Sequence, residues 1–230
     1  MGTKGGRLYL VSTPIGNLED ITLRAIKVLR GVDLIAAEDT RRAKRLLARY
    51  RATAPLTSFF EHNETAKKQA LIKRLLAGDD IALISDAGTP GVSDPGFRLV
   101  QGAIEAGIEV VPIPGPSAHV AALVVSGLPT DSFHFFGFLP PKGSKRNKRL
   151  EEINAVRGTI ILYEAPHRLL RTLGDIREVC GDRPIVVARE LTKMYEEVVR
   201  GAVSEVLEEL EGRKIKGEIT LVMAGRGRGG

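Results

Sequence analysis

The sequence predicts an α/β protein in which short strands alternate with helices along most of the chain. Three observations support this prediction. The expected strands are only a few residues long and almost wholly apolar. Between them, apolar residues recur at helical spacing, and Gly and Pro mark the junctions. Apolar strands of this kind are typical of a mainly parallel sheet that helices cover on both faces.

The first half of the chain is expected to alternate strictly between strand and helix. The apolar strand at 8–12 ends at Pro14 and Gly16, and the helix at 20–29 places Ile21, Ala25 and Leu29 on one face. The further strands are expected at 33–37, 57–60, 81–85 and 109–113. The further helices are expected at 41–50, 64–77, 96–106 and 117–125.

The second half of the chain has a different character. A phenylalanine-rich segment at 133–138 leads into a basic segment at 142–149, which is expected to be a loop. Strands are expected at 159–163, 184–188 and 218–223, and helices at 169–179 and 202–210. This change predicts two α/β domains, residues 1–126 and 127–230.

Composition excludes several classes of protein. Among 230 residues, 43% are hydrophobic and 27% are charged, which is normal for a globular protein and excludes disordered and collagen-like chains. A single cysteine, Cys180, excludes an intrachain disulfide and a cysteine-based zinc site. No apolar run is long enough to span a bilayer, and the N-terminus does not resemble a secretory signal. We therefore expect a cytoplasmic protein, whose net charge of +6 is shared by both halves.

Three turn-rich loops are candidate ligand-binding segments. The loop at 85–96 follows a strand, precedes a helix and contains three glycines and two prolines, which is longer than a structural turn requires. The segments at 12–18 and 112–118 also follow strands. If these strands are parallel, all three loops meet at one edge of the sheet, where α/β proteins bind ligands.

Charged residues at strand ends have two possible roles. Asp39, Arg41 and His62 follow the second and third strands, where they could line a pocket or could serve as helix caps and solvated side chains. The basic segment has cations at Lys142, Lys145, Arg146, Lys148 and Arg149 and contains no acid. Such a segment can bind phosphates or can remain a solvated loop.

Eight motifs together give the sequence a family resemblance. They are Thr13–Asn17, Glu38–Arg41, Phe60–Asn63, Ser85–Gly96, Pro114–Ala118, Phe136–Pro140, Tyr163–Arg168 and Ala188–Lys193. On these motifs the chain resembles the tetrapyrrole methylase superfamily over about residues 7–225. The resemblance implies two αβα domains with S-adenosylmethionine in a cleft between them.

Within that superfamily, the chain looks like the branch that methylates the ribose 2′-hydroxyl of a cytidine in small-subunit (16S) ribosomal RNA. Porphyrin and corrin methylases usually have Gly-Asp-Pro where this chain has Asp86-Ala-Gly-Thr-Pro90. The resemblance also implies a homodimer without a metal ion.

The resemblance implies cofactor contacts from strand-end segments of both domains. They are Pro14, Ser85, Asp86, Ala87, Gly88, Ser117, Ala118, Phe138, Leu139, Tyr163, Ala188, Gly217, Glu218 and Ile219. The RNA phosphates would be held by Arg41, Lys142, Lys145, Arg146, Lys148 and Arg149.

A ribose hydroxyl is a poor nucleophile until it loses its proton, so a general base is expected. The candidate catalytic residues are His62, Asp39, Glu61 and Asp86, with none preferred. Two other functions remain open at this point. One is a methyltransferase of the same fold that acts on a corrin or porphyrin precursor, and the other is a non-catalytic RNA-binding factor for ribosome assembly.

Overall fold

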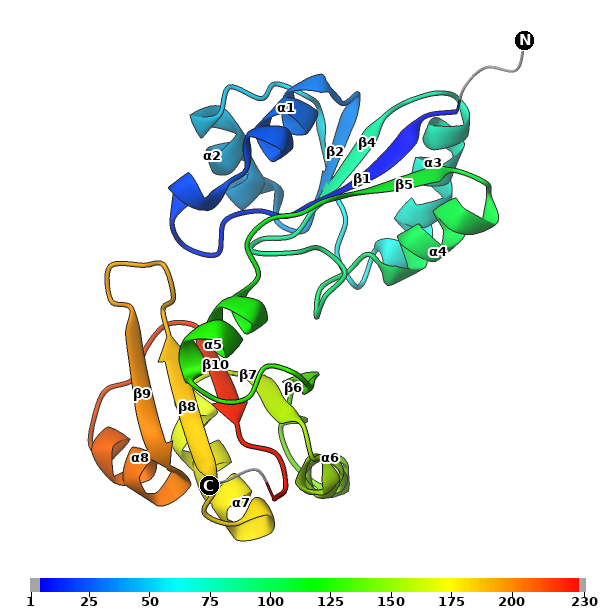
Figure 1. The fold of residues 1–230 in the computed structure, drawn as a ribbon. Coiled ribbons are helices and arrows are strands. Elements are labelled where there is room, and N and C mark those ends of the chain that lie inside the picture. The colour runs from blue at the N-terminus through cyan, green and yellow to red at the C-terminus, as the bar shows by residue number, and fades with distance from the viewer. Residues whose placement is uncertain (1–4, 228–230) are drawn as a thin grey trace. The chain divides into compact units, whose positions relative to one another are not determined.

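The chain forms two compact α/β units, as the sequence predicts (Figure 1). The computed structural model describes residues 5–227. Unit 1 ends at Ser117 and unit 2 begins at Ala118, one helix earlier than the expected boundary after Ser126. The difference arises because helix α5 (Ala118–Ser126) packs against strands of the second sheet.

Unit 1 is built on a five-stranded parallel sheet with the order β3-β2-β4-β1-β5. Its strands are β1 (Arg7–Val11), β2 (Leu34–Ala37), β3 (Leu56–Ser58), β4 (Ile81–Ile84) and β5 (Glu109–Ile113). Its helices are α1 (Leu23–Gly31), α2 (Thr40–Arg49), α3 (Glu64–Leu76) and α4 (Phe97–Glu105), and a 3-10 turn, η1 (Leu18–Asp20), precedes α1.

Helices cover both faces of this sheet, which explains why its strands are apolar throughout. On one face, Ala25 and Leu29 of α1 pack with Ala43 and Leu47 of α2 against Ile35. On the other face, α3 and α4 pack against the alternate strand residues. Figure 1 shows α1 and α2 on one side of the sheet and α3 and α4 on the other.

Unit 2 has a mixed five-stranded sheet with the order β6-β7-β10-β8-β9. Its strands are β6 (Phe133–Phe138), β7 (Thr159–Glu164), β8 (Pro184–Arg189), β9 (Glu197–Ala202) and β10 (Ile219–Met223). Strands β6 and β7 are parallel, whereas β10 is antiparallel to both β7 and β8, and β9 is antiparallel to β8.

Helices lie on both faces of the second sheet as well. The larger core lies under α6 (Ser144–Ala155), α7 (Leu169–Cys180) and α8 (Val203–Leu210), and a short η2 turn (Pro166–Arg168) precedes α7. The opposite face is covered by α5 through Ala122 and Leu123. No helix among residues 5–227 is both long and apolar enough to cross a membrane.

Two elements of unit 2 differ from the sequence prediction. The expected basic loop is largely helix α6, whose Leu150 and Ile153 are buried in the core. The strand β9 was not predicted at all, and it completes a hairpin with β8. In both cases charged residues interrupt the apolar residues of the segment, so its local pattern does not indicate the element. The element is stabilised by packing against the rest of unit 2.

Candidate functional site

The candidate residues of unit 1 lie at the carboxyl edge of its sheet. Because all five strands are parallel, the loops that follow them emerge at the same edge. This confirms the prediction that the segments after β1, β4 and β5 share one edge. The same edge carries the polar residues that follow β2 and β3.

Hydrogen bonds join the loops after β1, β4 and β5. Thr13 and Gly88 form an isolated antiparallel bridge, in which the two backbone N···O distances are 2.9 and 3.0 Å. The hydroxyl of Thr13 donates to the carbonyl of Ser85 at 3.3 Å, and those of Ser12 and Thr89 lie 3.0 Å apart. The hydroxyl of Thr89 also lies 3.4 Å from the carbonyl oxygen of Pro116. Three loops that are distant in sequence therefore form one connected surface.

Two glycines allow this close arrangement of backbone. Gly88 has a φ of +81°, which L side chains rarely adopt. A Cβ on Gly115 would lie 2.9 Å from the Cβ of Ser12, so a side chain there would push the loops apart. Pro14 and Ser85 are buried within this surface, while Asp86 and Ala87 are partly exposed on it.

Asp86 is held by the start of α2. Its Oδ1 accepts a hydrogen bond from the backbone N–H of Asp39 at 3.0 Å, and its Oδ2 lies 3.0 Å from Arg42. Asp39 caps α2 by accepting the N–H of Arg41 at 2.8 Å, and hydrogen bonds from Arg41 lower the pKa of Asp39. The capping role considered for Asp39 in the sequence is therefore observed, and it brings Asp39 beside Asp86.

Two further carboxyl groups at this edge, Glu38 and Asp94, were not singled out as catalytic candidates. Burial, with a smaller contribution from Asp86, raises the pKa of Glu38. Burial, together with the charges of Glu38 and Asp86, raises the pKa of Asp94 to about 6. Glu38, Asp86 and Asp94 are thus three interacting carboxyl groups, of which Glu38 follows β2 and the other two lie in the loop after β4. We call them the Glu38–Asp86–Asp94 group. The motifs Glu38–Arg41 and Ser85–Gly96 contain all three residues and could have indicated them.

Glu61 and His62 lie on the exposed turn after β3, the edge strand of this sheet. The His62 ring contacts Phe60 edge-on, with 6.4 Å between ring centroids. No hydrogen bond among the described residues joins Glu61 or His62 to the Glu38–Asp86–Asp94 group. Of the four predicted catalytic residues, the structure thus shows a direct contact between Asp39 and Asp86.

Unit 2 places its predicted cofactor residues in register at one edge of its sheet. Phe138 pairs with Tyr163, Tyr163 pairs with Thr220, and Thr220 pairs with Ala188. Since β10 runs opposite to β6, β7 and β8, its first residue Ile219 lies at the edge where those strands end. The segments Phe138–Leu139 and Gly217–Ile219, far apart in sequence, therefore lie at the same edge of the sheet, with the end of β7 between them.

Aromatic rings cluster at this edge. The Tyr163 ring contacts Phe135 and Phe138, with centroids 4.9 and 5.6 Å apart. His119 stacks on Phe135 at 4.6 Å, and its Nδ1 lies 3.3 Å from the Tyr163 hydroxyl. Burial lowers the pKa of His119, so burial favours its neutral form. Phe138 remains 55% exposed, whereas Leu139, which follows it, is buried in the core. An exposed ring backed by other rings can bind a flat ligand by stacking.

A tight polar corner begins strand β10. Lys193 Nζ lies 2.8 Å from Glu190 Oε1 and 2.9 Å from Glu218 Oε2, and the N–H of Glu218 donates to Glu190 Oε1. Gly217 has a φ of +89°, and a Cβ there would lie 2.3 Å from the Glu190 side chain. Only glycine fits this position without displacing Glu190. Ser117 and Ala118, the remaining predicted contacts, directly precede and begin α5.

The basic segment does not act as one surface. Arg146 is 2% exposed, so the prediction that it binds RNA is corrected. Its guanidinium donates to Asp175 at 2.8 Å, to the Pro140 carbonyl at 3.1 Å and to Thr172 Oγ1 at 2.9 Å. The other four cations of the segment are exposed: Lys142, Lys145, Lys148 and Arg149.

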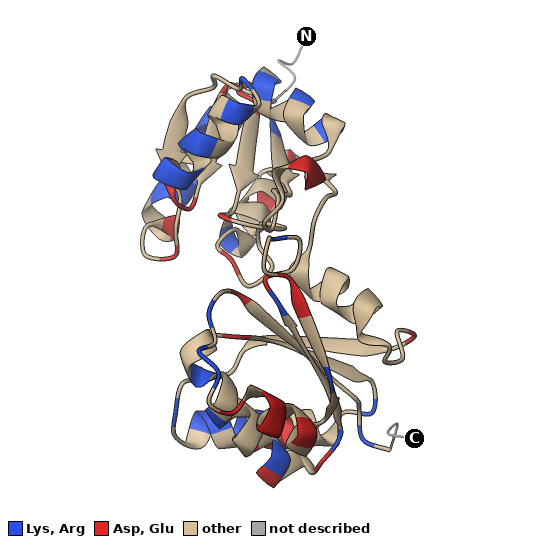
Figure 2. Cartoon of the chain, turned by 90° about the vertical axis from the view of Figure 1, so that its left-hand side faces the viewer, with Lys and Arg blue, Asp and Glu red and all other residues tan. Residues whose placement is uncertain are grey.

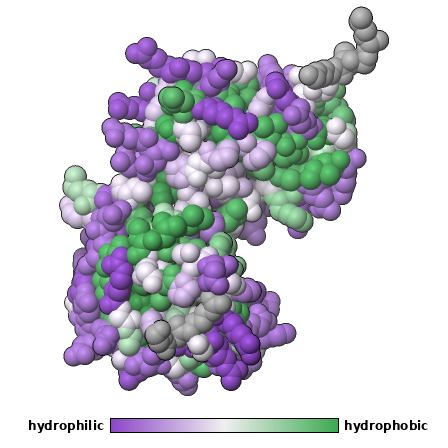
Figure 3. All heavy atoms as spheres, viewed as in Figure 1, coloured by the Kyte–Doolittle hydropathy of each residue, from purple (hydrophilic) through white to green (hydrophobic). Residues whose placement is uncertain are grey.

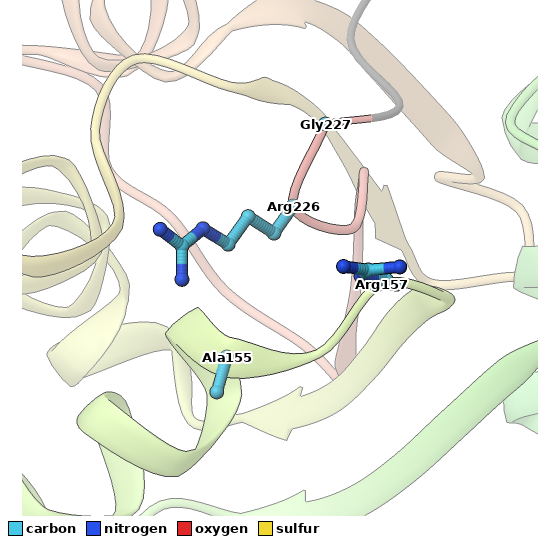
Figure 4. A pocket seen from close by; sticks show the side chains of 4 residues that line it. All are labelled: Ala155, Arg157, Arg226 and Gly227. Carbon is cyan, nitrogen blue, oxygen red and sulfur yellow. The ribbon is translucent and has the colours of Figure 1, made fainter.

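A hollow in unit 2 lies away from these residues. It is lined by Ala155, Arg157, Arg226 and Gly227 (Figure 4). Arg226 follows β10 and Arg157 precedes β7, so the hollow lies at the opposite edge of the sheet from the predicted cofactor residues. Among residues 5–227, no group of three or more His, Cys, Asp or Glu side chains is placed to hold a metal ion.

Comparison with known families gives one match that covers most of the chain. The model of the family described as Tetrapyrrole (Corrin/Porphyrin) Methylases matches residues 7–207.

Several curated relatives share the name ribosomal RNA small subunit methyltransferase I. The relative from Halalkalibacterium halodurans is 50% identical over 96% of this chain and 77% of its own length. The relative from Thermotoga maritima is 49% identical over 96% of this chain and 99% of its own length. The relative from Escherichia coli O157:H7 is 50% identical over 96% of this chain and 78% of its own length.

Solved structures share the fold at low sequence identity. The methyltransferase CobJ is 20% identical, with a TM-score of 0.69 over 96% of this chain and 95% of its own. Uroporphyrin-III C-methyltransferase from Thermus thermophilus, solved with S-adenosyl homocysteine, is 18% identical, with a TM-score of 0.67 over 95% of this chain and 97% of its own.

Proposed function

The chain belongs to the tetrapyrrole methylase family, and from this premise we propose that it transfers a methyl group from S-adenosylmethionine to small-subunit ribosomal RNA. One observation carries the proposal. About half of the residues are identical to those of curated relatives named ribosomal RNA small subunit methyltransferase I, over 96% of the chain. The atom methylated is proposed to be the ribose 2′-oxygen of a cytidine.

The strand-end surfaces of the two units fit the chemical demands of such a cofactor. In unit 1, Gly88 and Gly115 leave the backbone accessible where three loops meet. In unit 2, the half-exposed ring of Phe138 offers a stacking surface beside Tyr163. Backbone groups and a flat apolar surface together suit a nucleoside that carries a charged amino-acid tail.

The residues proposed to hold the cofactor are those at these two edges. They are Pro14, Ser85–Gly88, Ser117, Ala118, Phe138, Leu139, Tyr163, Ala188 and Gly217–Ile219. When bound, the cofactor supplies an activated methyl group. The protein's own tasks are to position the ribose oxygen, to exclude water and to accept the proton that the hydroxyl loses.

We propose that a carboxyl group of the Glu38–Asp86–Asp94 group accepts this proton. A pKa of about 6 for Asp94 lies near neutrality, where a general base is most effective. Asp86 is positioned by the N–H of Asp39 and by Arg42. Glu61 and His62 remain as alternatives on the turn after β3.

The test is transfer of labelled methyl from S-adenosylmethionine to small ribosomal subunits from cells that lack this protein, followed by nuclease mapping. Label on one cytidine ribose is the expected result. Cofactor binding with label only on a corrin or porphyrin precursor would instead support the small-molecule branch. RNA binding that does not depend on S-adenosylmethionine, without any methyl transfer, would support a non-catalytic assembly factor.

Two further properties belong to the proposal. An RNA substrate in the small ribosomal subunit implies that the enzyme works in the cytoplasm. The homodimer that the family resemblance implies is tested directly by the mass of the protein in solution, measured by light scattering.

A further inference from the structure

We propose that the outer face of helices α1 and α2 in unit 1 is a docking surface for the RNA phosphate backbone. We call this surface the α1–α2 face. This inference deepens the proposed function and rests on it. It assigns the electrostatic contact with the substrate mainly to a surface different from the basic segment at 142–149.

The two helices carry positive charge without any acid. The ten residues of α2 include five cations, and the nine residues of α1 include three. Neither helix contains Asp or Glu. The cations are Arg24, Lys27, Arg30, Arg41, Arg42, Lys44, Arg45 and Arg49, and all of them are exposed.

Packing brings the two helices together as one surface. Their apolar residues share a single core cluster on one face of the sheet. Arg30 at the end of α1 donates to the carbonyl of Tyr50 at the end of α2, at 2.7 Å. Figure 2 shows Lys and Arg gathered on the helices of unit 1 that face the viewer, and Figure 3 shows hydrophilic residues over α1 and α2.

The chain itself does little to neutralise this charge. Arg41 pairs with Asp39, and Arg42 pairs with Asp86. Among the described residues, Lys44, Arg45 and Arg49 form no ion pair with an acid. Arg45 also follows Arg41 by four residues and precedes Arg49 by four, and like charges at this spacing destabilise a helix. A bound polyanion would relieve this repulsion.

The position of α2 connects this charge to the candidate site. Helix α2 begins at the carboxyl end of β2, where Arg42 contacts Asp86 at 3.0 Å. It then runs for about 15 Å back along the sheet. A strand of RNA with one ribose at the carboxyl edge could therefore continue along α2 and place successive phosphates beside Lys44, Arg45 and Arg49.

The chemistry of α2 favours RNA over a lipid membrane. A helix that binds in a membrane surface inserts large apolar side chains into the lipid. The apolar residues Ala43 and Leu47 of α2 are instead buried in the protein core. The exposed side of α2 presents arginine and lysine, which are the side chains that most often contact phosphates.

The test compares binding of small ribosomal subunits across a salt series. The test variant is Lys44→Ala/Arg45→Ala/Arg49→Ala, which removes three exposed cations and keeps good helix formers. Each lost phosphate contact should flatten the salt dependence by about 0.7–0.9 in the log–log slope, so we expect a change of about 2. Affinity near physiological salt should fall by about 10- to 100-fold.

A matched control removes the same charge from scattered exposed positions. Lys73→Ala/Arg177→Ala/Lys214→Ala should keep the wild-type slope and affinity. Both variants should bind S-adenosylmethionine as the wild type does. With saturating subunits, the test variant should retain kcat while its KM for subunits rises, because it loses docking and not chemistry.

The possible outcomes separate the two proposals. If the wild type methylates RNA and the test variant keeps the wild-type salt slope, the docking surface is wrong while the proposed function stands. Equal losses in the test and control variants would show diffuse attraction and would also overturn it. Binding to phosphatidylserine vesicles that needs the same three cations, without any effect on RNA, would assign the face to membranes. If the wild type neither binds nor methylates RNA, the proposed function fails and the inference fails with it.

Discussion

The buried guanidinium of Arg146 gives the sharpest test of the structure, because sequence alone assigned this residue to RNA. Arg146→Ala removes hydrogen bonds to Asp175, Thr172 and the Pro140 carbonyl. Thr172 in turn donates to the buried carboxylate of Glu164 at 2.6 Å. The substitution therefore disturbs a network that joins α6, α7 and the end of β7.

The expected loss of stability follows from these contacts. Removing one partner of a buried ion pair typically costs about 3–5 kcal/mol. The Asp175 side chain is 29% exposed and lies 3.9 Å from Arg171, so part of its charge remains compensated by water and by that neighbour. We expect Arg146→Ala to lower the free energy of unfolding by about 3 kcal/mol.

The assay is urea unfolding followed by circular dichroism, with hydrogen exchange of α6 and α7 to localise the loss. Lys145→Ala is the matched control, because Lys145 is the exposed neighbour on the same helix, and its effect should stay within about 0.5 kcal/mol. Equal stability of the two variants would refute the buried network. A flatter salt dependence of RNA binding in the charge-removing variant Arg146→Gln, with folding unchanged, would refute the structural role in favour of a phosphate contact.

Three further predictions concern single positions in the two units. The folded state holds the proton of Asp94 up to a pKa of about 6, so the stability of the wild type falls as pH rises from about 4 to 6. Asp94→Asn should remove this fall and raise the free energy of unfolding by about 1 kcal/mol above about pH 7. This value is small because the Asp94 carboxyl is partly exposed to solvent. Thermal unfolding measured across pH would check it. Glu64→Ala should lower the free energy of unfolding in urea by about 1–3 kcal/mol, because the Glu64 carboxylate accepts a hydrogen bond from the N–H of Gly96 at 3.2 Å. Glu64→Gln, which keeps an acceptor oxygen, should lower it less. Gly217→Ala should lower the free energy of unfolding by more than about 1 kcal/mol, and by more than Gly212→Ala does. Both glycines have a positive φ, but only Gly217 lies against the side chain of Glu190. Equal costs at the two glycines would show that backbone conformation alone decides.

Local patterns in the sequence predict most of unit 1. The strand expected at 109–113 coincides with β5, and α2 begins one residue before its expected start, at Thr40, which follows the cap Asp39. Apolar strands and amphipathic helices are encoded in neighbouring residues, so they can be recognised without the fold. The prediction that three loops share an edge succeeded because parallel pairing leaves no other arrangement.

Features that depend on distant partners could not be predicted in the same way. Helix α6 and strand β9 are stabilised by packing against the rest of unit 2. The environment of Asp94 depends on Glu38, a residue of another strand end. The burial of Arg146 depends on Asp175 in α7. A charge pattern does not distinguish a cation that faces solvent from one that completes a core network.

The separation of the two sheets has a consequence for synthesis of the chain. Every strand of the first sheet ends by Ile113, and its core clusters contain no residue beyond that point. No strand of the second sheet is therefore needed to complete the first. Because domains fold as units and N-terminal domains emerge first, unit 1 can fold on the ribosome while unit 2 is still being translated. A pause in translation after unit 1 emerges would then leave a folded intermediate that already contains the complete parallel sheet.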